Sequence, residues 1–193
     1  MSARGTVRPG GRSARVQESV HRAVRELVEE QGRDGLSVPM VAARAGVTPS
    51  TVYRRWGDIG ELLSDVAVER LRPEGPPEDL GSLRDDLHAW AELFLDEMAS
   101  PPGRAYIRDA LIGDPDGGNA GQCSAYAAQQ LAVVFGRAAE RGEAAPELEY
   151  AMDHLVSPMM YRILFRPSRP LTAEYARELV DDLMSRRAGP RKG

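Results

Sequence analysis

The chain has 193 residues, of which 42% are hydrophobic and 28% charged, with a formal net charge of -4 and one cysteine. This length supports a core that is stable without cross-links, and a single cysteine excludes an intrachain disulfide, as is usual in a reducing compartment. No apolar run approaches the roughly 20 residues that cross a bilayer. No apolar stretch follows the N-terminal arginines, as it would in a signal peptide. We therefore expect a cytoplasmic protein that does not contact a membrane.

The charge is distributed unevenly along the chain. Residues 1–57 contain ten arginines and five acidic residues, a net charge of +5, whereas the remainder carries -9. A basic end on an acidic body favours a local polyanionic partner, because neutralising phosphates supplies much of the affinity for nucleic acids. Charge alone leaves open the alternative that the basic end is a solubilising tail.

Helical periodicity dominates the chain, and no segment alternates long enough to predict a strand. Behind a basic arm at residues 1–12, one apolar stripe predicts a helix of about four turns that ends at Gly32 and Gly35. The stripe consists of Val16, Val20, Ala23, Val24, Leu27 and Val28. His21 lies in this basic helix, and we expect it to face solvent or DNA.

Three shorter helices follow, each with a side chain that can cap its first turn. Ser37, Thr48 and Asp58 are the predicted caps, and Gly46 separates the first two of these helices. The proline-rich stretch at residues 73–79 is the predicted linker. Beyond it, apolar periodicity predicts helices at about 81–99, 102–112, 121–142, 146–165 and 172–187. The fold class is therefore all-α, with about nine helices.

Residues 36–56 carry the clearest functional pattern. Two short helices are separated by a tight turn at Gly46, which supplies a backbone conformation that other residues resist. On the second of these helices, Val52 and Trp56 point into the core, and the hydroxyl and arginine side chains remain outside. Small hydroxyls at the N-terminal end of a short helix can reach base edges in a major groove. Tyr53 and the arginines lie further along, where phosphates would pass.

These residues resemble the helix-turn-helix of the TetR family of regulators, and the resemblance extends over residues 13–72. The matching positions are Val41, Ala42, Ala43, Arg44, Ala45, Gly46, Val47, Thr48, Tyr53 and Trp56, followed by Glu61, Leu62 and Leu63. Two positions depart from the family. Ile59 stands where members often have a lysine that meets a phosphate, and Arg33 stands where many have an aromatic residue.

The resemblance implies a function and a set of contacts. The protein would be a homodimer that binds an inverted repeat in double-stranded DNA, usually as a repressor. Pro49, Ser50, Thr51 and Arg54 would face bases, while Thr48, Tyr53 and Arg55 would hold the backbone. Arg12, which a flexible arm can carry into a minor groove, and Ser37 complete the predicted DNA contacts. The implied domains are the arm at 1–12, the helix-turn-helix domain at 13–57, a connecting helix at 58–72, a ligand-binding and dimerisation domain at 80–187 and a tail at 188–193.

The second half of the chain also contains an aromatic cluster. Its members are Trp90, Phe94, Met98, Tyr106, Leu111 and Tyr126. They suit a pocket for a small apolar or aromatic effector among the helices of residues 81–142, whose binding would lower DNA affinity. The alternative is that these residues simply fill the core.

The last two helices each carry a broad apolar stripe that favours a four-helix dimer interface. The predicted interface residues are Leu155, Met159, Ile163, Tyr175, Leu179 and Leu183. Pro158 lies inside the first of these helices, and we expect it to kink the helix because it lacks a backbone donor.

No catalytic motif, metal-binding spacing or cofactor-binding loop is present in the sequence. His88 and His154 are expected to be satisfied helix residues, and Cys123 a small buried hydrophobe. Two other classes of function remain possible. One is a helical adaptor whose basic domain docks an acidic protein partner, and the other is an enzyme with a site assembled from scattered residues such as His88, Asp109 and His154.

Overall fold

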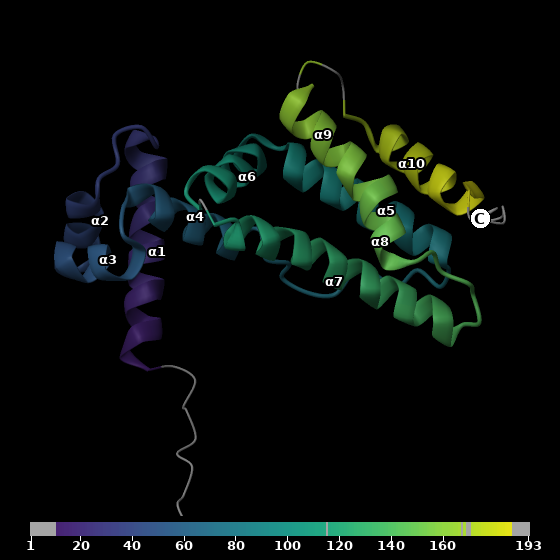
Figure 1. Cartoon of the computed structure of the whole chain (residues 1–193), viewed down its shortest axis with the longest axis horizontal. Coiled ribbons are helices and arrows are strands. Elements are labelled where there is room, and N and C mark those ends of the chain that lie inside the picture. Colours follow the sequence, from purple (N-terminus) through teal and green to yellow (C-terminus); the bar gives the residue numbers. More distant parts are fainter. Residues whose placement is uncertain (1–10, 115, 167, 169–170, 187–193) are drawn as a thin grey trace, which may run out of the picture.

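The computed structural model describes residues 11–114, 116–166, 168 and 171–186, and the side chains of Arg12 and Arg186 lie outside this description. The described residues form helices and contain no strand (Figure 1). The elements are α1 (Arg12–Gln31), α2 (Val38–Ala45), α3 (Pro49–Trp56), α4 (Ile59–Arg70), α5 (Leu83–Ala99), α6 (Pro101–Ile112), α7 (Gly118–Glu140), α8 (Leu148–Ala151), η1 (Met152–Val156), α9 (Ser157–Phe165) and α10 (Ala173–Arg186). The all-α prediction is confirmed, and each predicted helix is present.

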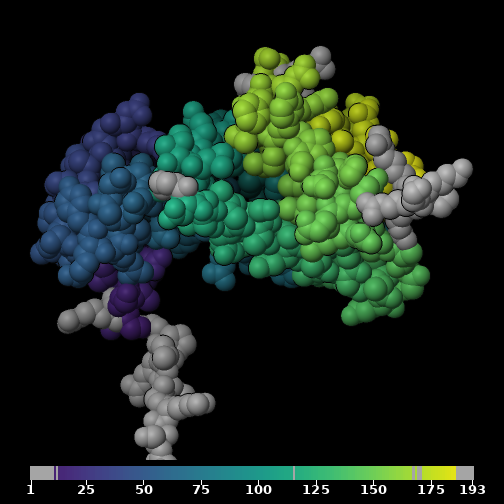
Figure 2. All heavy atoms as spheres, in the orientation of Figure 1, coloured from purple at the N-terminus to yellow at the C-terminus, as the bar shows by residue number. Residues whose placement is uncertain are grey.

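The helices form two lobes, each with its own core. α1, α2 and α3 gather at one end of the molecule, and α5 and α7–α10 lie toward the other (Figure 1), and the same division is visible in the space-filling view (Figure 2). The first core consists of side chains from α1 to α4, with Val20, Val41, Val52 and Leu62 fully buried. The second core joins α5, the middle of α7 and the last helices. Each amphipathic stripe thus buries its apolar face against a neighbouring helix, which is the main source of helix stability in water.

α4 connects the two lobes. Its first two turns contribute Leu62, Leu63 and Val66 to the first core, while Leu71, just after its end, packs against the second. The Asp58 side chain accepts a hydrogen bond from the backbone N–H of Glu61 at 2.9 Å, which caps the helix as predicted. α4 and the residue that follows it therefore contact both cores.

α4 also lies against α6 at close range. A Cβ atom added to Gly113, at the end of α6, would overlap the carbonyl oxygen of Gly60. Ser64 Oγ donates to the carbonyl oxygen of Ala110 at 3.3 Å and accepts from Asn119 Nδ2 at 2.8 Å. Glycine at both crossing positions allows the two backbones to touch, so a displacement of α6 is transmitted directly to α4.

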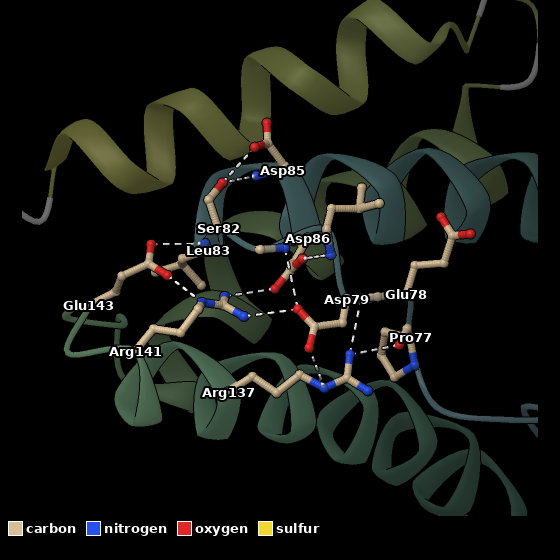
Figure 3. Close-up of polar contacts among 12 residues, drawn as sticks. Pro77, Glu78, Asp79, Ser82, Leu83, Asp85, Asp86, Arg137, Arg141 and Glu143 are labelled. Atoms are coloured by element: carbon tan, nitrogen blue, oxygen red, sulfur yellow. Dashed lines mark hydrogen bonds and ion pairs between the residues drawn. The ribbon is translucent and has the colours of Figure 1, made fainter.

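The proline-rich linker is held against the second lobe (Figure 3). Arg137 donates to the carbonyl oxygens of Pro77 and Glu78 at 2.8 and 3.1 Å. Arg141 contacts Asp79 at 3.0 Å and the buried Asp86 carboxylate at 2.8 Å. These charge-assisted hydrogen bonds hold the linker against α5 and α7, so the linker is fixed to the second lobe.

Pro158, where the sequence predicts a kink, lies in the first turn of α9, and a short π-helical segment precedes that helix. The five residues Met152–Val156 form η1, between α8 and α9. The hydroxyl of Ser157 donates to the carbonyl oxygen of Met152 at 3.0 Å. A wider turn of this kind accommodates a proline that cannot donate to the helix ladder.

Candidate nucleic-acid interface

The turn between α2 and α3 positions the candidate DNA-reading helix. α2 buries Val38, Val41 and Ala42 against α1 and α3. Gly46 then adopts the left-handed conformation, with φ 70°, and its N–H donates to the carbonyls at the end of α2. Pro49 occupies the first turn of α3, where its missing N–H costs nothing. The sequence thus fixes both the end of α2 and the start of α3.

α3 has one buried face and one exposed face. Val52 and Trp56 are buried, as predicted. The predicted DNA-contacting side chains lie on the other face: Thr48, Pro49, Ser50, Tyr53, Arg54 and Arg55 are exposed and Thr51 is half-buried. The Thr48 hydroxyl lies 3.0 Å from that of Ser50 and 2.9 Å from that of Thr51. The N-terminal end of α3 therefore presents a cluster of three hydroxyls that can donate or accept hydrogen bonds.

Arg55 differs from the other exposed residues because α1 already binds it. Its guanidinium donates to the carbonyl oxygen and the hydroxyl of Ser13, both at 2.9 Å, and to the amide oxygen of Gln17. It also lies 4.9 Å from the centroid of the Trp56 ring. Arg55 thus fastens the first turns of α1 to α3, a contact that spacing within α3 could not reveal.

Two further residues, Ser37 and Arg12, are predicted to contact DNA. Ser37 is half-buried before α2, and its side chain makes no capping hydrogen bond there. The side chain of Arg12 lies outside the described residues.

His21 contradicts its prediction, because its side chain is only 1% exposed. Its Nε2 lies 2.8 Å from Asp65 Oδ2, and its Nδ1 contacts Glu69 Oε2. The indole N–H of Trp56 donates to the same Asp65 oxygen at 2.7 Å. Burial disfavours the charged imidazole, but the hydrogen bonds to Asp65 and Glu69 outweigh it and raise the pKa of His21. Helical spacing places His21 beside Val20 and Val24 without indicating its carboxylate partners, so sequence reasoning missed this cluster.

The predicted effector-binding residues divide into two groups. Trp90 is buried, its ring centroid lies 5.1 Å from that of Phe94, and Phe94 and Met98 pack against the second core. Tyr106 and Tyr126 are half-buried. Leu111 is 51% exposed near the end of α6, so it does not belong to an enclosed pocket in this conformation. A defined hollow lies elsewhere, about 550 Å³ in volume between α9 and α10, where Tyr161, Arg162 and Tyr175 line it.

The structure contradicts four of the six predicted dimer-interface residues. Leu155, Met159, Ile163 and Leu183 are fully buried in the chain's own second core, so they cannot form a surface for a partner, whereas Tyr175 and Leu179 remain partly exposed. Periodicity identified the buried face of these helices but not what buries it. The outer face of α9 instead exposes Tyr161 and Phe165, at 56% and 70%, with ring centroids 5.4 Å apart.

The three residues considered for a scattered catalytic site have separate partners. His88 contacts Asp181 at 3.1 Å, His154 contacts the carbonyl oxygen of Tyr150 at 2.9 Å, and Asp109 pairs with Arg33. Across the described ranges, no group of three or more His, Cys, Asp or Glu side chains is arranged to hold a metal ion.

Cys123 is half-buried, whereas the sequence predicts a buried residue, and this partial burial raises the pKa of its thiol. Nor is any helix of the described residues long and apolar enough to cross a membrane.

A tight-turn pair of helices with a polar, basic outer face defines the class of helix-turn-helix DNA-binding proteins. Residues 22–66 match the family model described as bacterial regulatory proteins of the tetR family, and residues 77–183 match the tetracyclin repressor-like C-terminal domain. The chain belongs to the TetR family of DNA-binding transcriptional regulators, which are not enzymes.

Individual relatives agree with this assignment. An uncharacterised HTH-type transcriptional regulator of Mycobacterium tuberculosis is 31% identical over 166 residues, covering 82% of this chain and 80% of the relative. The crystal structure of the TetR family transcription regulator SCO0332 has a TM-score of 0.66 at 26% identity and covers 88% of this chain and 97% of its own. Thermus thermophilus FadR, a TetR family repressor solved with lauroyl-CoA, shares the fold with a TM-score of 0.59 at 16% identity, covering 92% and 97%.

Proposed function

We propose that the protein is a dimeric repressor that binds an inverted-repeat operator through α3 and leaves it when a small apolar effector binds the second lobe. The observation that carries the proposal is the exposed face of α3, with three clustered hydroxyls and two arginines above a buried Val52–Trp56 face. Residues 13–57 would read DNA, residues 58–72 would connect the lobes, and residues 80–187 would bind the effector and the second subunit. Because its operator lies on the chromosome, we place the protein in the cytoplasm.

The exposed residues of α3 divide into two proposed roles. Pro49, Ser50, Thr51 and Arg54 would meet base edges in the major groove, where each base pair presents a distinct pattern of donors and acceptors. Thr48 and Tyr53 would hold the phosphate backbone and set the position of α3 in the groove. Arg55 has donors left after binding Ser13 and Gln17, so it can support α1 and still meet a phosphate.

A second copy would pack on the outer face of α9 and α10. Tyr161 and Phe165 expose two aromatic rings there, next to the hollow between the two helices. Aromatic side chains are enriched at protein interfaces because they bury large areas at small entropic cost. A two-fold axis through this face would pair two copies of α3 with the two halves of an inverted repeat.

The effector would act through the contact between α6 and α4. Its proposed site is the Trp90–Phe94–Met98 cluster of α5, and the lauroyl-CoA in the FadR complex supports a largely apolar ligand. A ligand that displaces α6 would push Gly113 against Gly60 and tilt α4. Because α4 also contributes to the first core, the spacing of the two α3 helices would change and both could no longer dock.

Two experiments test these proposals. Selection of bound sequences from a random DNA pool should return an inverted repeat, and recovery of no common sequence would contradict operator recognition. For the effector, the dye 1-anilinonaphthalene-8-sulfonate serves as an apolar probe and is titrated with and without the selected DNA. Coupling between sites is reciprocal, typically about 1–3 kcal/mol, so DNA should weaken dye binding roughly 5- to 150-fold. Equal dye affinities would contradict the coupling for this probe.

A further inference from the structure

One carboxylate oxygen joins three helices of the first lobe. Asp65 Oδ2, on α4, lies 2.7 Å from Trp56 Nε1 of α3 and 2.8 Å from His21 Nε2 of α1. The side-chain amide of Gln17, also on α1, lies 3.4 Å away. The other nitrogen of His21 contacts Glu69 Oε2, one turn further along α4. We call His21, Trp56, Asp65 and Glu69 the polar node.

The polar node differs from the surrounding core in being directional. The neighbouring contacts, made by Val20, Val52 and Leu62, are apolar, and apolar contacts have no preferred direction. A hydrogen bond weakens steeply when its angle or length changes, so the node fixes the rotation of α3 relative to α1 and α4. Trp56 is the last residue of α3, so this constraint acts on the helix proposed to read DNA.

The geometry also specifies the protonation state that completes the node. Both ring nitrogens of His21 face carboxylate oxygens. An ionised carboxylate only accepts hydrogen bonds, and a neutral imidazole has a single donor, so only the imidazolium can donate to both partners. A neutral His21 would turn a lone pair toward Asp65 or Glu69.

We propose that His21 and Asp65 are positioning residues that hold α3 in the orientation that docks on DNA, and that this orientation requires the imidazolium form of His21. The proposal rests on DNA binding through α3. It adds two residues that lie outside the exposed face of α3, the buried His21 and the half-buried Asp65. Neither would touch the operator, yet together they would set its affinity and make that affinity depend on pH.

The charged groups around His21 fix the direction of the pH effect. Asp65 and Glu69 face it from α4; from α1, Arg25 lies 3.5 Å from Glu69, and from α3 the charge of Arg55 acts on Asp65. The pKa of His21 is raised above 6.5 in the folded protein because its hydrogen bonds to the two carboxylates outweigh burial. The stabilisation is therefore fully present below pH 6.5 and is lost as the pH rises through the folded pKa. DNA affinity should fall over the same interval.

The test measures operator affinity of the full chain by fluorescence anisotropy from pH 6 to pH 9 at constant ionic strength. Linkage limits the change to about tenfold for each unit by which DNA raises the pKa of His21, and we expect roughly a three- to tenfold loss across the range. His21→Gln should bind more weakly at low pH and show a flat profile. His88→Gln is the matched control: that histidine contacts Asp181 in the other lobe, and its loss should leave the wild-type profile.

Two further measurements do not depend on His21→Gln folding. Trp56→Phe removes the indole donor together with one ring of a buried core side chain, so its thermal unfolding temperature should fall. At a temperature where the variant is folded, it should still bind the operator several-fold more weakly than the wild type at pH 6. An NMR titration of His21 in the wild-type protein should give a higher pKa with operator than without it. Equal pKa values in the two titrations, or a wild-type profile in folded His21→Gln, would overturn the proposal. Absence of sequence-specific binding at any pH would instead contradict the proposed function itself.

Discussion

Thr51 and Arg55 lie one turn apart on α3, and their surroundings predict different phenotypes. Thr51 belongs to the hydroxyl cluster at the N-terminal end of the helix. Thr51→Ala should change the preferred base at one position of each half-site and keep the wild-type salt dependence, because direct readout carries sequence information. Arg55→Ala should weaken binding to all sequences alike. It should also lower the slope of log affinity against log salt by about 0.9, the amount that one neutralised phosphate contributes.

Anisotropy titrations of both variants against a set of single-base operator variants, at several salt concentrations, check this pair. Arg55→Ala with an unchanged affinity and an unchanged slope would mean that its bonds to Ser13 and Gln17 are its whole role.

Glycine substitutions test the close contact between the lobes. A Cβ on Gly113 would overlap the backbone of Gly60, so Gly113→Ala should lower the free energy of unfolding by about 1–3 kcal/mol, as overpacking does. Gly136, on an exposed face of α7, has open space around its Cα, and Gly136→Ala should raise stability by about 0.5–1 kcal/mol through helix propensity. Urea unfolding of the two variants gives both values. If Gly113→Ala left the free energy of unfolding unchanged, α4 and α6 could separate without cost.

The ion pair between Arg33 and Asp109 fastens the turn after α1 to α6. The Asp109 side chain is only 6% exposed. Arg33→Ala would leave this carboxylate buried without its cation, and the free energy of unfolding should fall by about 1–3 kcal/mol. The aromatic residue that many members have near this position is therefore replaced here by a polar contact between the lobes.

A double-mutant cycle separates this pair from a general loss of packing. Arg33→Ala, Asp109→Ala and the double variant should be strongly non-additive, because the double variant leaves no unpaired charge. The exposed pair Arg84–Asp181 is the control, for which coupling of about 0–1 kcal/mol is expected. Additive effects at Arg33 and Asp109 would contradict a direct interaction.

The helices themselves are predictable from sequence, whereas several of their partners are not. Apolar spacing and capping residues such as Asp58 report on local structure, and the structure reproduces those helices. Periodicity shows which face of a helix is buried but not whether its own chain or another subunit buries it. The prediction of a dimer interface at Leu155, Met159 and Ile163 is therefore wrong, because these residues fill the second core. Similarly, His21 and Asp65 are 44 residues apart, and no local pattern joins them.

The exposed aromatic rings on the outer face of α9 predict that the protein assembles through α9 and α10. Light scattering at micromolar protein should give the mass of a dimer. Phe165→Asp should shift the mass toward a monomer, because it places a charge within a desolvated interface. Leu93→Asp, at an exposed position on α5, should leave the dimer intact. A monomeric wild-type protein under these conditions would exclude the two-fold docking on DNA.

The uneven charge distribution is consistent with this arrangement. The basic residues 1–57 carry a net charge of +5 and include the exposed face of α3, while the acidic remainder, at -9, would be repelled by phosphates. Such a distribution favours approach to DNA with the first lobe leading, and its effect should weaken as salt screens the charges.

We propose above all that α3 recognises a specific inverted repeat. Footprinting of the full chain on the DNA upstream of its own gene tests this most directly. We expect one protected region with two symmetric half-sites about one helical turn apart, or a small multiple of that spacing, whose protection is weakened by Thr51→Ala or Arg54→Ala. Protection spread evenly along the fragment, or a protected site that both variants still occupy like the wild type, would contradict it.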